Sequence, residues 1–241
     1  MSTRPHGYLS PAAFAALQQA SSATISTQLL KRGFRNTFMP GLVALRPDLR
    51  LVGYAYTLRY VPMREDLTLN QPLDNRTNQQ RIAIEDVGPG DVLVIDARGD
   101  VQAATLGNIL AERVLLRGAA GIVTDGAFRD LPEFRSMGFP TYARAAHAAV
   151  SWLSHYAADR NVPIGCAGVL VMPGDVIVGD AEGVIAIPAQ VAEEVALAAA
   201  EQEELEVFLL EKIRAGASIL TAYPPDAATL QEYEQWRNRR S

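Results

Sequence analysis

Residues 105–130 read TLGNILAERVLLRGAAGIVTDGAFRD, and this stretch decides the class of fold. Gly107 and Asn108 precede a run in which apolar side chains recur at helical spacing, and Gly118 ends the run as a C-cap. A short apolar strand over residues 121–125 follows directly. A helix that leads straight into such a strand is typical of a layered α/β domain. The side chains expected on the apolar face of the helix are Ile109, Leu110, Val114 and Leu115.

Further short runs outside this stretch also predict strands, because they are rich in β-branched or aromatic residues and are bounded by Gly, Pro or Asp. They cover residues 51–61, 92–96, 176–179 and 184–187. Two of them follow nearly identical tetrapeptides, Gly88-Pro89-Gly90-Asp91 and Met172-Pro173-Gly174-Asp175. Proline presets φ and glycine permits positive φ, so both tetrapeptides predict tight turns. A phosphate-binding loop is the alternative, but neither GxxxxGK(S/T) nor GxGxxG occurs.

Helices are predicted on both sides of this strand-rich middle. The first covers residues 11–28, is rich in alanine and follows Ser10, a suitable N-cap. A long acidic helix is predicted over residues 189–214, and residues 221–241 are typical of a turn and a final short helix. The long helix could pack on its own domain or on a neighbouring subunit, and both alternatives stay open.

Length and composition narrow the class of protein. The 241 residues carry a formal charge of −5, and we expect them to form a single domain, residues 1–241, with residues 189–241 as a helical C-terminal extension. The acidic balance argues against direct nucleic-acid binding, and no apolar run approaches the roughly 20 residues of a membrane helix. Residues 1–10 lack the apolar core of a signal segment and Cys166 is the lone cysteine, so we expect a cytoplasmic protein.

The strongest chemical signal lies just past the strand over residues 121–125, where Arg129 and Asp130 are adjacent. Ligands collect at strand ends of α/β folds, and the helix that starts after Gly107 aims free N–H groups in a way suited to a carboxylate or phosphate. The Arg129 guanidinium matches a carboxylate or an enolate oxygen but is a poor base. Asp130 can bind Mg²⁺ or Mn²⁺, which need only one or two protein carboxylates. A surface ion pair is the alternative interpretation of this dipeptide.

Two segments resemble the RraA-like proteins, which include the 4-hydroxy-4-methyl-2-oxoglutarate/4-carboxy-4-hydroxy-2-oxoadipate aldolases, class II pyruvate aldolases. The segments are residues 107–130, GNILAERVLLRGAAGIVTDGAFRD, and residues 173–188, PGDVIVGDAEGVIAIP. The resemblance implies an α/β fold, the layered β/β/α sandwich of the swivelling-domain type, here with N- and C-terminal helical extensions. It also implies assembly as a homotrimer or a homohexamer with active sites at subunit contacts.

The same resemblance implies roles for individual residues. Arg129 would hold the pyruvyl part of the substrate and stabilise its enolate, and Asp130 would hold the divalent metal, Mg²⁺, Mn²⁺ or another divalent cation, largely through water. The backbone amides around the helix start would receive the substrate carboxylate. The expected catalytic residues are therefore Arg129, Asp130 and Asn108, the expected metal ligand is Asp130, and the expected substrate-binding residues are Gly107, Asn108, Ile109, Leu110 and Arg129.

The chain departs from the aldolase pattern at two points. Asn108 stands where the aldolases carry an Asp, and an amide cannot act as a base, although it can cap a helix. Ser26-Thr27 stands where relatives usually read Ser-Asp. The chain also carries basic and amide side chains that could together select a longer, hydroxylated acid as substrate. For each of them, an ordinary position on the surface is the alternative. They are Gln28, Lys31, Arg32, Arg35, Asn36, Arg59 and Arg64.

Other candidate residues carry weaker signals. The three histidines, His6, His147 and His155, lack metal-ligand spacing, and no serine lies in a GxSxG motif. Cys166 is typical of a small buried strand residue rather than a nucleophile.

The sequence therefore predicts a divalent-metal-dependent lyase that cleaves a 4-hydroxy-2-oxo acid to pyruvate or an analogue through an enolate. Oxaloacetate decarboxylation would pass through the same intermediate. Two alternatives remain: a hydratase or dehydratase acting on a sugar-derived 2-oxo acid, and a non-catalytic protein-binding regulator of ribonuclease E. The Arg129-Asp130 pair favours an enzyme. The expected partners are a small 2-oxo acid and further copies of the chain, without nucleic acid or membrane.

Overall fold

The computed structural model describes residues 9–67 and 74–240. Its helices are α1 (Pro11–Gln19), α2 (Ser22–Lys31), α3 (Gln79–Asp86), α4 (Asn108–Leu116), α5 (Leu131–Ser136), α6 (Ala192–Arg214), α7 (Ile219–Ala222) and α8 (Ala227–Asn238), with 3₁₀ turns η1 (Glu65–Leu67), η2 (Ser151–Leu153) and η3 (Ala189–Val191). Its strands are β1 (Phe38–Met39), β2 (Val43–Ala44), β3 (Leu51–Pro62), β4 (Asp91–Asp96), β5 (Ala104–Leu106), β6 (Gly121–Thr124), β7 (Ala127–Phe128), β8 (Thr141–Ala143), β9 (Ala145–Ala146), β10 (His155–Arg160), β11 (Ile164–Cys166), β12 (Val169–Val171), β13 (Val176–Gly179) and β14 (Val184–Ile187). The predicted strands correspond to β3, β4, β6, β13 and β14.

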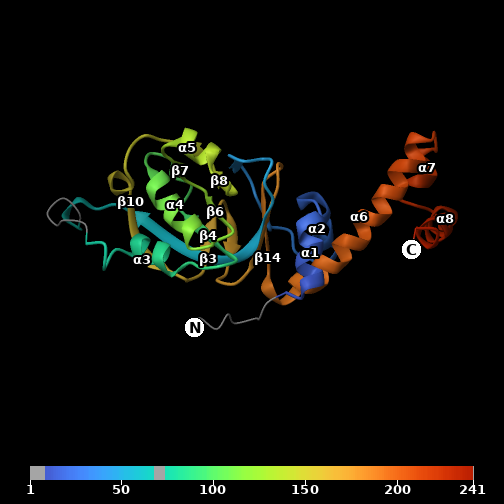
Figure 1. Ribbon diagram of the computed structural model, residues 1–241, viewed down its shortest axis with the longest axis horizontal. Helices are drawn as coiled ribbons and strands as arrows, with labels where there is room; N and C mark the ends of the chain where they lie inside the picture. Colours follow the sequence, from blue (N-terminus) through green and yellow to red (C-terminus); the bar gives the residue numbers. More distant parts are fainter. Residues whose placement is uncertain (1–8, 68–73, 241) are drawn as a thin grey trace.

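One large curled sheet forms the centre of the described structure, in the order β1-β14-β13-β3-β4-β6-β8-β2, with β10 also paired to β3 (Figure 1). Its middle strands β3, β4, β6 and β8 run parallel, because helical crossovers connect them. Helices α3, α4 and α5 contribute to the core on one face of the sheet, and the β11–β12 hairpin contributes to the core on the other. These layers confirm the predicted α/β sandwich.

The two predicted turns are present and are built in the same way. The amides of Asp91 and Asp175 donate to the carbonyl of the first turn residue at 3.0 and 3.1 Å. Each of these carboxylates accepts the N–H of that same first residue, at 2.9 and 2.8 Å. Gly90 and Gly174 adopt φ angles of 78° and 88°, which only glycine adopts without strain. The tetrapeptides are therefore turns that feed β4 and β13.

The prediction of one continuous helix over residues 11–28 is wrong, because the segment forms two helices, α1 and α2. Ser10 caps α1 as predicted, since its Oγ accepts the Ala13 amide at 3.1 Å. A second serine, Ser21, caps α2 in the same way and accepts the Thr24 amide at 3.1 Å. A serine side chain inside a helix competes with the backbone for hydrogen bonds, and here Ser21 starts a second helix.

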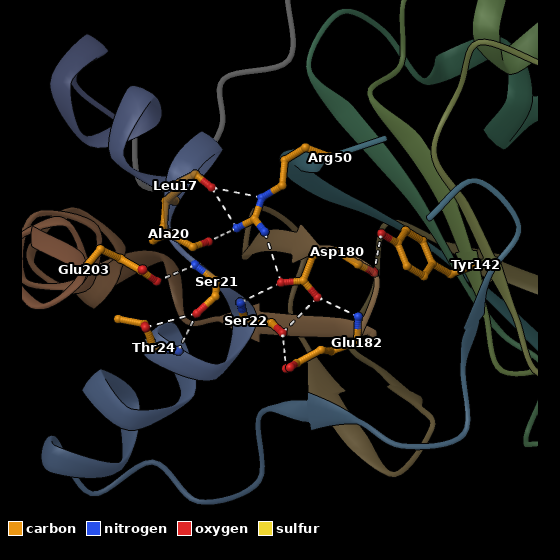
Figure 2. A network of polar contacts seen from close by, with 10 residues as sticks. All are labelled: Leu17, Ala20, Ser21, Ser22, Thr24, Arg50, Tyr142, Asp180, Glu182 and Glu203. Atoms are coloured by element: carbon orange, nitrogen blue, oxygen red, sulfur yellow. Dashed lines mark hydrogen bonds and ion pairs between the residues drawn. The ribbon is translucent and has the colours of Figure 1, made fainter. Parts of the chain in front are cut away.

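Arg50 lies at this break and satisfies the carbonyl groups where α1 ends (Figure 2). Its guanidinium donates to Leu17 O at 2.9 Å and also to Ala20 O. The same group forms an ion pair with Asp180 at 3.1 Å, and Asp180 also accepts the Ser22 amide at 2.7 Å. One guanidinium thus joins the end of α1, the start of α2 and the loop after β13.

The C-terminal residues form an arm. η3 precedes α6, which packs against α1 and α2 and then extends away from the sheet with α7 and α8 at its far end (Figure 1). Phe208, Leu209 and Tyr233 form a small separate core there. Large apolar side chains nevertheless stay exposed along the arm, namely Leu197, Val207, Leu210, Ile219, Leu220 and Leu230. Within residues 9–67 and 74–240, no helix is both long and apolar enough to cross a membrane.

Candidate active site

A small parallel sheet, β5-β7-β9, brings the two halves of the predicted site together. Leu106 lies opposite Phe128 in this sheet, and the Arg129 amide donates to Leu106 O at 3.3 Å. Because β5 and β7 end at the same edge, the start of α4 lies directly beside the start of α5. The residues on either side of that edge are Gly107 and Asn108 on one chain segment, and Arg129 and Asp130 on the other.

Asp130 connects β7 to α5 and has a left-handed backbone, with φ 62° and ψ 43°. This conformation is uncommon outside glycine, but Asp tolerates it better than most residues. Asp130 Oδ2 accepts the Asn108 amide at 3.2 Å and lies 3.4 Å from Arg129 Nε. Asp130 therefore occupies the N-terminal end of α4, which is the place predicted to attract a carboxylate.

Gly107 makes this close approach possible. It is the N-cap residue of α4 and provides no side-chain cap. A Cβ at this position would lie 2.6 Å from Asp130 Oδ2 and 3.0 Å from Arg129 Cγ. Any side chain here would therefore displace both functional groups.

If the expected lyase reaction takes place here, Gly107→Ala should lower its kcat/KM about 100-fold. The added Cβ would shift Arg129 and Asp130, and a misplacement of about 1 Å costs this much when reacting groups must be aligned. The fold should persist, because the Gly107 φ of −118° suits alanine and loss of a glycine N-cap costs about 1 kcal/mol or less. Steady-state kinetics and thermal melting of the variant test both statements. The matched control is Gly138→Ala, where a Cβ would meet no atom within 4 Å. Full activity in Gly107→Ala would contradict the proposed crowding.

The first turn of α4 differs from the prediction in one respect. Ile109 does not belong to the buried face, because it is 80% exposed and the buried residues of α4 are Ala111 and Val114. The helical spacing of apolar residues predicted a buried Ile109, but an apolar side chain can also line a cavity and stay exposed. Ile109 and Leu110 both line the cavity beside the helix start.

That cavity has a volume of about 1020 Å³ and opens next to Arg129 and Asp130. Five parts of the chain form its walls: the end of β3, the segment that starts α3, the β5–α4 junction, the β7–α5 junction, and η2 with β10. Gly107, Asn108, Ile109, Leu110, Arg129 and Asp130 all line it. The structure thus gathers every predicted site residue around one cavity.

Sequence reasoning missed a second group of lining residues, Tyr60, Gln80, Arg81, Trp152 and His155. Tyr60 Oη and Gln80 Nε2 both donate to Thr105 O, at 3.0 and 2.6 Å. His155 stacks on the Tyr60 ring with centroids 5.2 Å apart. The only sequence signal for this group is the strand over residues 51–61, which places Tyr60 in the core without indicating the cavity.

His155 is buried, and burial lowers the pKa of its imidazole. Its Nε2 lies 3.1 Å from Ala103 O, and a carbonyl can only accept, so Nε2 carries the proton in the neutral ring. The lone pair is then on Nδ1, which has no hydrogen-bond partner in the described structure. A neutral imidazole with a free lone pair therefore lies in the wall of the cavity.

Asp125, at the end of the predicted strand over residues 121–125, and Cys166, the lone cysteine, both have structural roles in the core. Asp125 is buried and accepts the amides of Ala97, Gly99 and Ala167 at 2.6 to 3.1 Å. Burial raises its pKa, while these hydrogen bonds oppose the shift. Cys166 is fully buried in β11, and burial raises the pKa of its thiol, which suits packing rather than nucleophilic chemistry.

The basic and amide side chains that the sequence suggested for substrate selection lie outside the cavity in this chain. Arg32 pairs with Glu194 at 2.8 Å, and Arg64 pairs with Asp66 at 2.6 Å. Arg59 forms an ion pair with Asp159. The residues that line the cavity within the described segments do not include Gln28, Lys31, Arg32, Arg35, Asn36, Arg59 or Arg64.

The donor groups beside Arg129 suit a hard cation with few protein ligands. In the described segments, no three His, Cys, Asp or Glu side chains gather as a metal centre. Asp130 is one-third exposed at the cavity, so its carboxylate could bind a cation together with oxygen atoms of substrate and solvent. Mg²⁺ and Mn²⁺ accept such sparse coordination, whereas Zn²⁺ commonly takes three or four protein ligands.

Comparison with known proteins adds independent evidence. The family model described as RraA-like, Aldolase/RraA, matches residues 22–186. A provisionally named 4-hydroxy-4-methyl-2-oxoglutarate aldolase of Halalkalibacterium halodurans is 43% identical over 106 residues, which are 44% of this chain and 50% of that protein. The 4-hydroxy-4-methyl-2-oxoglutarate aldolase of Thermus thermophilus is 34% identical over 108 residues, 45% of this chain and 65% of that protein. The chain thus spans half of the first relative and less than two thirds of the second.

Solved structures show the same architecture. RraAS2 of Streptomyces coelicolor, described as an unusual member of the RNase ES inhibitor RraA protein family, has a TM-score of 0.74 at 32% identity. This similarity covers 85% of this chain and 98% of that chain. An uncharacterized protein of Pseudomonas syringae has a TM-score of 0.76 at 25% identity, over 90% of this chain and 99% of that chain.

Proposed function

Since this chain belongs to the RraA-like family, we propose that it is a carbon–carbon lyase of the class II aldolase type. Its substrate would be a 4-hydroxy-2-oxo acid, cleaved to pyruvate or a close analogue through an enolate. The aldolase names of its relatives support this reading. The observation that carries it is the meeting of the α4 helix end with Arg129 and Asp130 at one cavity.

In the proposed reaction the chain's own residues bind and stabilise charge. The amides at the start of α4 and the Arg129 guanidinium would hold the substrate carboxylate and the 2-oxo oxygen. When the C3–C4 bond breaks, its electron pair passes to the 2-oxo group, and Arg129 would offset the charge on the enolate oxygen. Asp130 would hold the divalent cation, Mg²⁺ or Mn²⁺, which supplies Lewis-acid polarisation of the 2-oxo group when bound.

The cleavage also needs an acceptor for the C4 hydroxyl proton. Asn108 cannot take that role, because an amide has no basic lone pair at neutral pH. Among the described residues that line the cavity, Asp74 and Asp130 carry solvent-accessible carboxylates that could accept a proton, whereas the basic Nδ1 of His155 is buried. Oxaloacetate would give the same enolate on losing CO₂, so we propose decarboxylation as a side activity.

Pyruvate release, coupled to lactate dehydrogenase, tests this function directly. We expect turnover of 4-hydroxy-4-methyl-2-oxoglutarate and of oxaloacetate with Mg²⁺, and loss of turnover with EDTA. The competing function is a protein-binding regulator, which Asn108 and the similarity to RraAS2 favour. No pyruvate from either substrate, combined with ribonuclease E inhibition at micromolar protein, would replace the lyase assignment with the regulator.

We also propose that the chain assembles as a homotrimer or homohexamer. The exposed apolar side chains along the α6–α8 arm, among them Leu210 and Leu220, support an association that would cover them. Sedimentation velocity should give a mass three or six times that of the monomer. Leu210→Glu should weaken assembly, whereas Glu201→Lys, a change on an exposed charged side chain of α6, should not. A stable wild-type monomer at micromolar concentration would contradict the proposal.

A further inference from the structure

The strand that leads into the site contains one extra residue. β5 pairs with β7 at two positions, and the register shifts between Ala104 and Leu106. Thr105 is therefore a β-bulge, because β5 uses three residues there and β7 uses two. Bulges bend the strand that carries them and are frequent beside active sites. This one lies two residues before Gly107, so its geometry determines where the amide end of α4 points.

Two buried side chains hold the carbonyl group of this bulge. Tyr60, at the end of β3, and Gln80, at the start of α3, both donate to Thr105 O, at 3.0 and 2.6 Å. Both residues are at most 4% exposed, and burial raises the pKa of the Tyr60 phenol, which therefore keeps the proton that it donates. Thr105 Oγ1 donates in turn to Ala127 O at 3.0 Å. Side-chain hydrogen bonds thus fix the bulge to β3, to α3 and to β7.

His155 supports the same arrangement from the neighbouring strand. It lies in β10, which pairs with β3, and its ring stacks on the Tyr60 ring with centroids 5.2 Å apart. Its Nε2 donates to Ala103 O at 3.1 Å, on the N-terminal side of the bulge. Three elements that are distant in sequence, β3, α3 and β10, therefore hold the backbone carbonyls of residues 103 and 105.

The site tolerates little movement of this segment. Asp130 Oδ2 accepts the Asn108 amide at 3.2 Å, and Leu106 O accepts the Arg129 amide at 3.3 Å. Both distances are at the upper end of the N–H···O range, so a further displacement of about 0.5 Å would break these contacts. A fixed bulge therefore matters for the alignment of α4 with Asp130, and not only for the stability of the sheet.

We propose that Tyr60 and Gln80 are positioning residues for the reaction, because they clamp the bulge at Thr105 and so hold the amide end of α4 against Asp130. This inference rests on the proposed lyase function and adds residues that act through the backbone of β5. One donor is enough to hold the carbonyl, whereas loss of both leaves the buried Thr105 O without either donor. Each of the two residues should therefore compensate for loss of the other.

The kinetic test removes the two donors one at a time and together. Tyr60→Phe keeps the ring that stacks on His155, and Gln80→Met keeps a side chain of similar length. The assay is pyruvate release from 4-hydroxy-4-methyl-2-oxoglutarate with Mg²⁺. Each single change should lower kcat by no more than about threefold, and the double change should lower it about 30- to 100-fold, because misalignment by about 1 Å costs up to this much. KM should change less than about threefold, since Arg129 still binds the substrate.

The matched control removes the same kinds of donor from two different carbonyls. Tyr142 Oη donates to Asp180 O at 3.1 Å, and Tyr142 does not line the cavity. Tyr142→Phe/Gln80→Met therefore loses one phenol hydroxyl and one amide but leaves Thr105 O with the Tyr60 donor. Both double variants should melt about 4–8 °C below the wild type, because each loses two hydrogen bonds.

The two double variants should differ in kcat, which a merely structural role would not produce. A loss in Tyr60→Phe/Gln80→Met that exceeds the product of the two single losses, and exceeds the loss in Tyr142→Phe/Gln80→Met, supports the clamp. A loss no greater than that product, or an equal loss in the control, would overturn the inference while leaving the lyase function intact.

Hydrogen exchange without substrate separates this inference from the proposed function. The amides at the start of α4 are bonded to Asp130 and Gly107, namely those of Asn108, Leu110 and Ala111. Their exchange in Tyr60→Phe/Gln80→Met should be at least about tenfold faster than in the wild type and in the control double variant. This difference supports the clamp even if the wild type releases no pyruvate, a result that would count against the lyase function alone. Equal exchange in the two double variants would overturn the clamp whatever the kinetics show.

Discussion

Replacement of Arg129 by alanine should lower kcat/KM for pyruvate release about 1000-fold while the melting temperature stays nearly constant. The large kinetic effect follows because loss of one preorganised donor at a developing oxyanion costs about 100- to 1000-fold, and Arg129 would also bind the substrate. The small stability effect follows because Arg129 is 38% exposed and its ion pair with Asp130 is a surface one. The kcat/KM of Arg129→Lys should lie between those of the wild type and Arg129→Ala, because lysine keeps the positive charge but lacks the planar set of donors.

Asp130→Asn is the matched change at the second position. Asparagine accepts the Asn108 amide and tolerates the left-handed backbone, so the end of α4 and the start of α5 should stay intact. Only the negative charge is lost, and we expect turnover to fall to background. Thermal melting of Asp130→Asn and Arg129→Ala tests whether the fold persists, and Mg²⁺-dependent kinetics of the same variants tests whether turnover is lost. Substantial activity in Asp130→Asn or in Arg129→Ala would contradict the assignment of this corner as the reaction centre.

The largest stability effect is expected at Arg50. Arg50→Met leaves Leu17 O, Ala20 O and the Asp180 carboxylate without their shared donor (Figure 2). Breaking a largely buried ion pair from one side costs about 3 kcal/mol, which should lower the melting temperature by about 6–12 °C in a chain of this size. The control Arg64→Met breaks an ion pair whose side chains are both more than 60% exposed, and it should change stability by less than about 0.5 kcal/mol.

The effect of Arg50→Met should also depend on pH. Burial by itself would raise the pKa of Asp180, but hydrogen bonds from Ser22 and Glu182 and the charge of Arg50 outweigh it, so the pKa lies below its ordinary value. A carboxyl with a lowered folded pKa stabilises the protein above its unfolded pKa of about 3.9, and this stability is lost as the pH falls through the folded pKa. The difference in melting temperature between wild type and variant should therefore shrink from pH 6 to pH 3. A constant difference would show that the Asp180 charge does not contribute.

Much of the fold could be predicted because its signals are local. The strands at residues 176–179 and 184–187 have the predicted bounds, since a turn with fixed chemistry precedes the first and a short loop separates the two. The break between α1 and α2 was not predicted, because the alanine-rich residues 11–20 favour a helix that continues. What stabilises the break is Arg50, which the chain brings to Leu17 and Ala20 only after folding.

The same distinction applies to the site. Gly107 and Asp130 follow from the start of a helix and the end of a strand, both of which are readable along the chain. Arg81 could not be identified, because it lies in a polar helix that is typical of a solvated surface. It lines the same cavity as Tyr60 and residues of β10, which are distant from it in sequence. Charged residues in polar helices therefore give no sequence signal when packing encloses them.

The contact between Asp130 and the amide end of α4 has a consequence for selectivity. A ligand that binds there must first displace the protein's own carboxylate, so the apparent affinity of the site is reduced by the fraction of time it is self-occupied. Simple monovalent anions such as chloride or acetate offer Asp130 no new partner, and they would compete poorly. Under the proposed function, a 2-oxo acid that arrives with a cation would offer the displaced side chain a replacement, so the site would favour ligands that come as a pair.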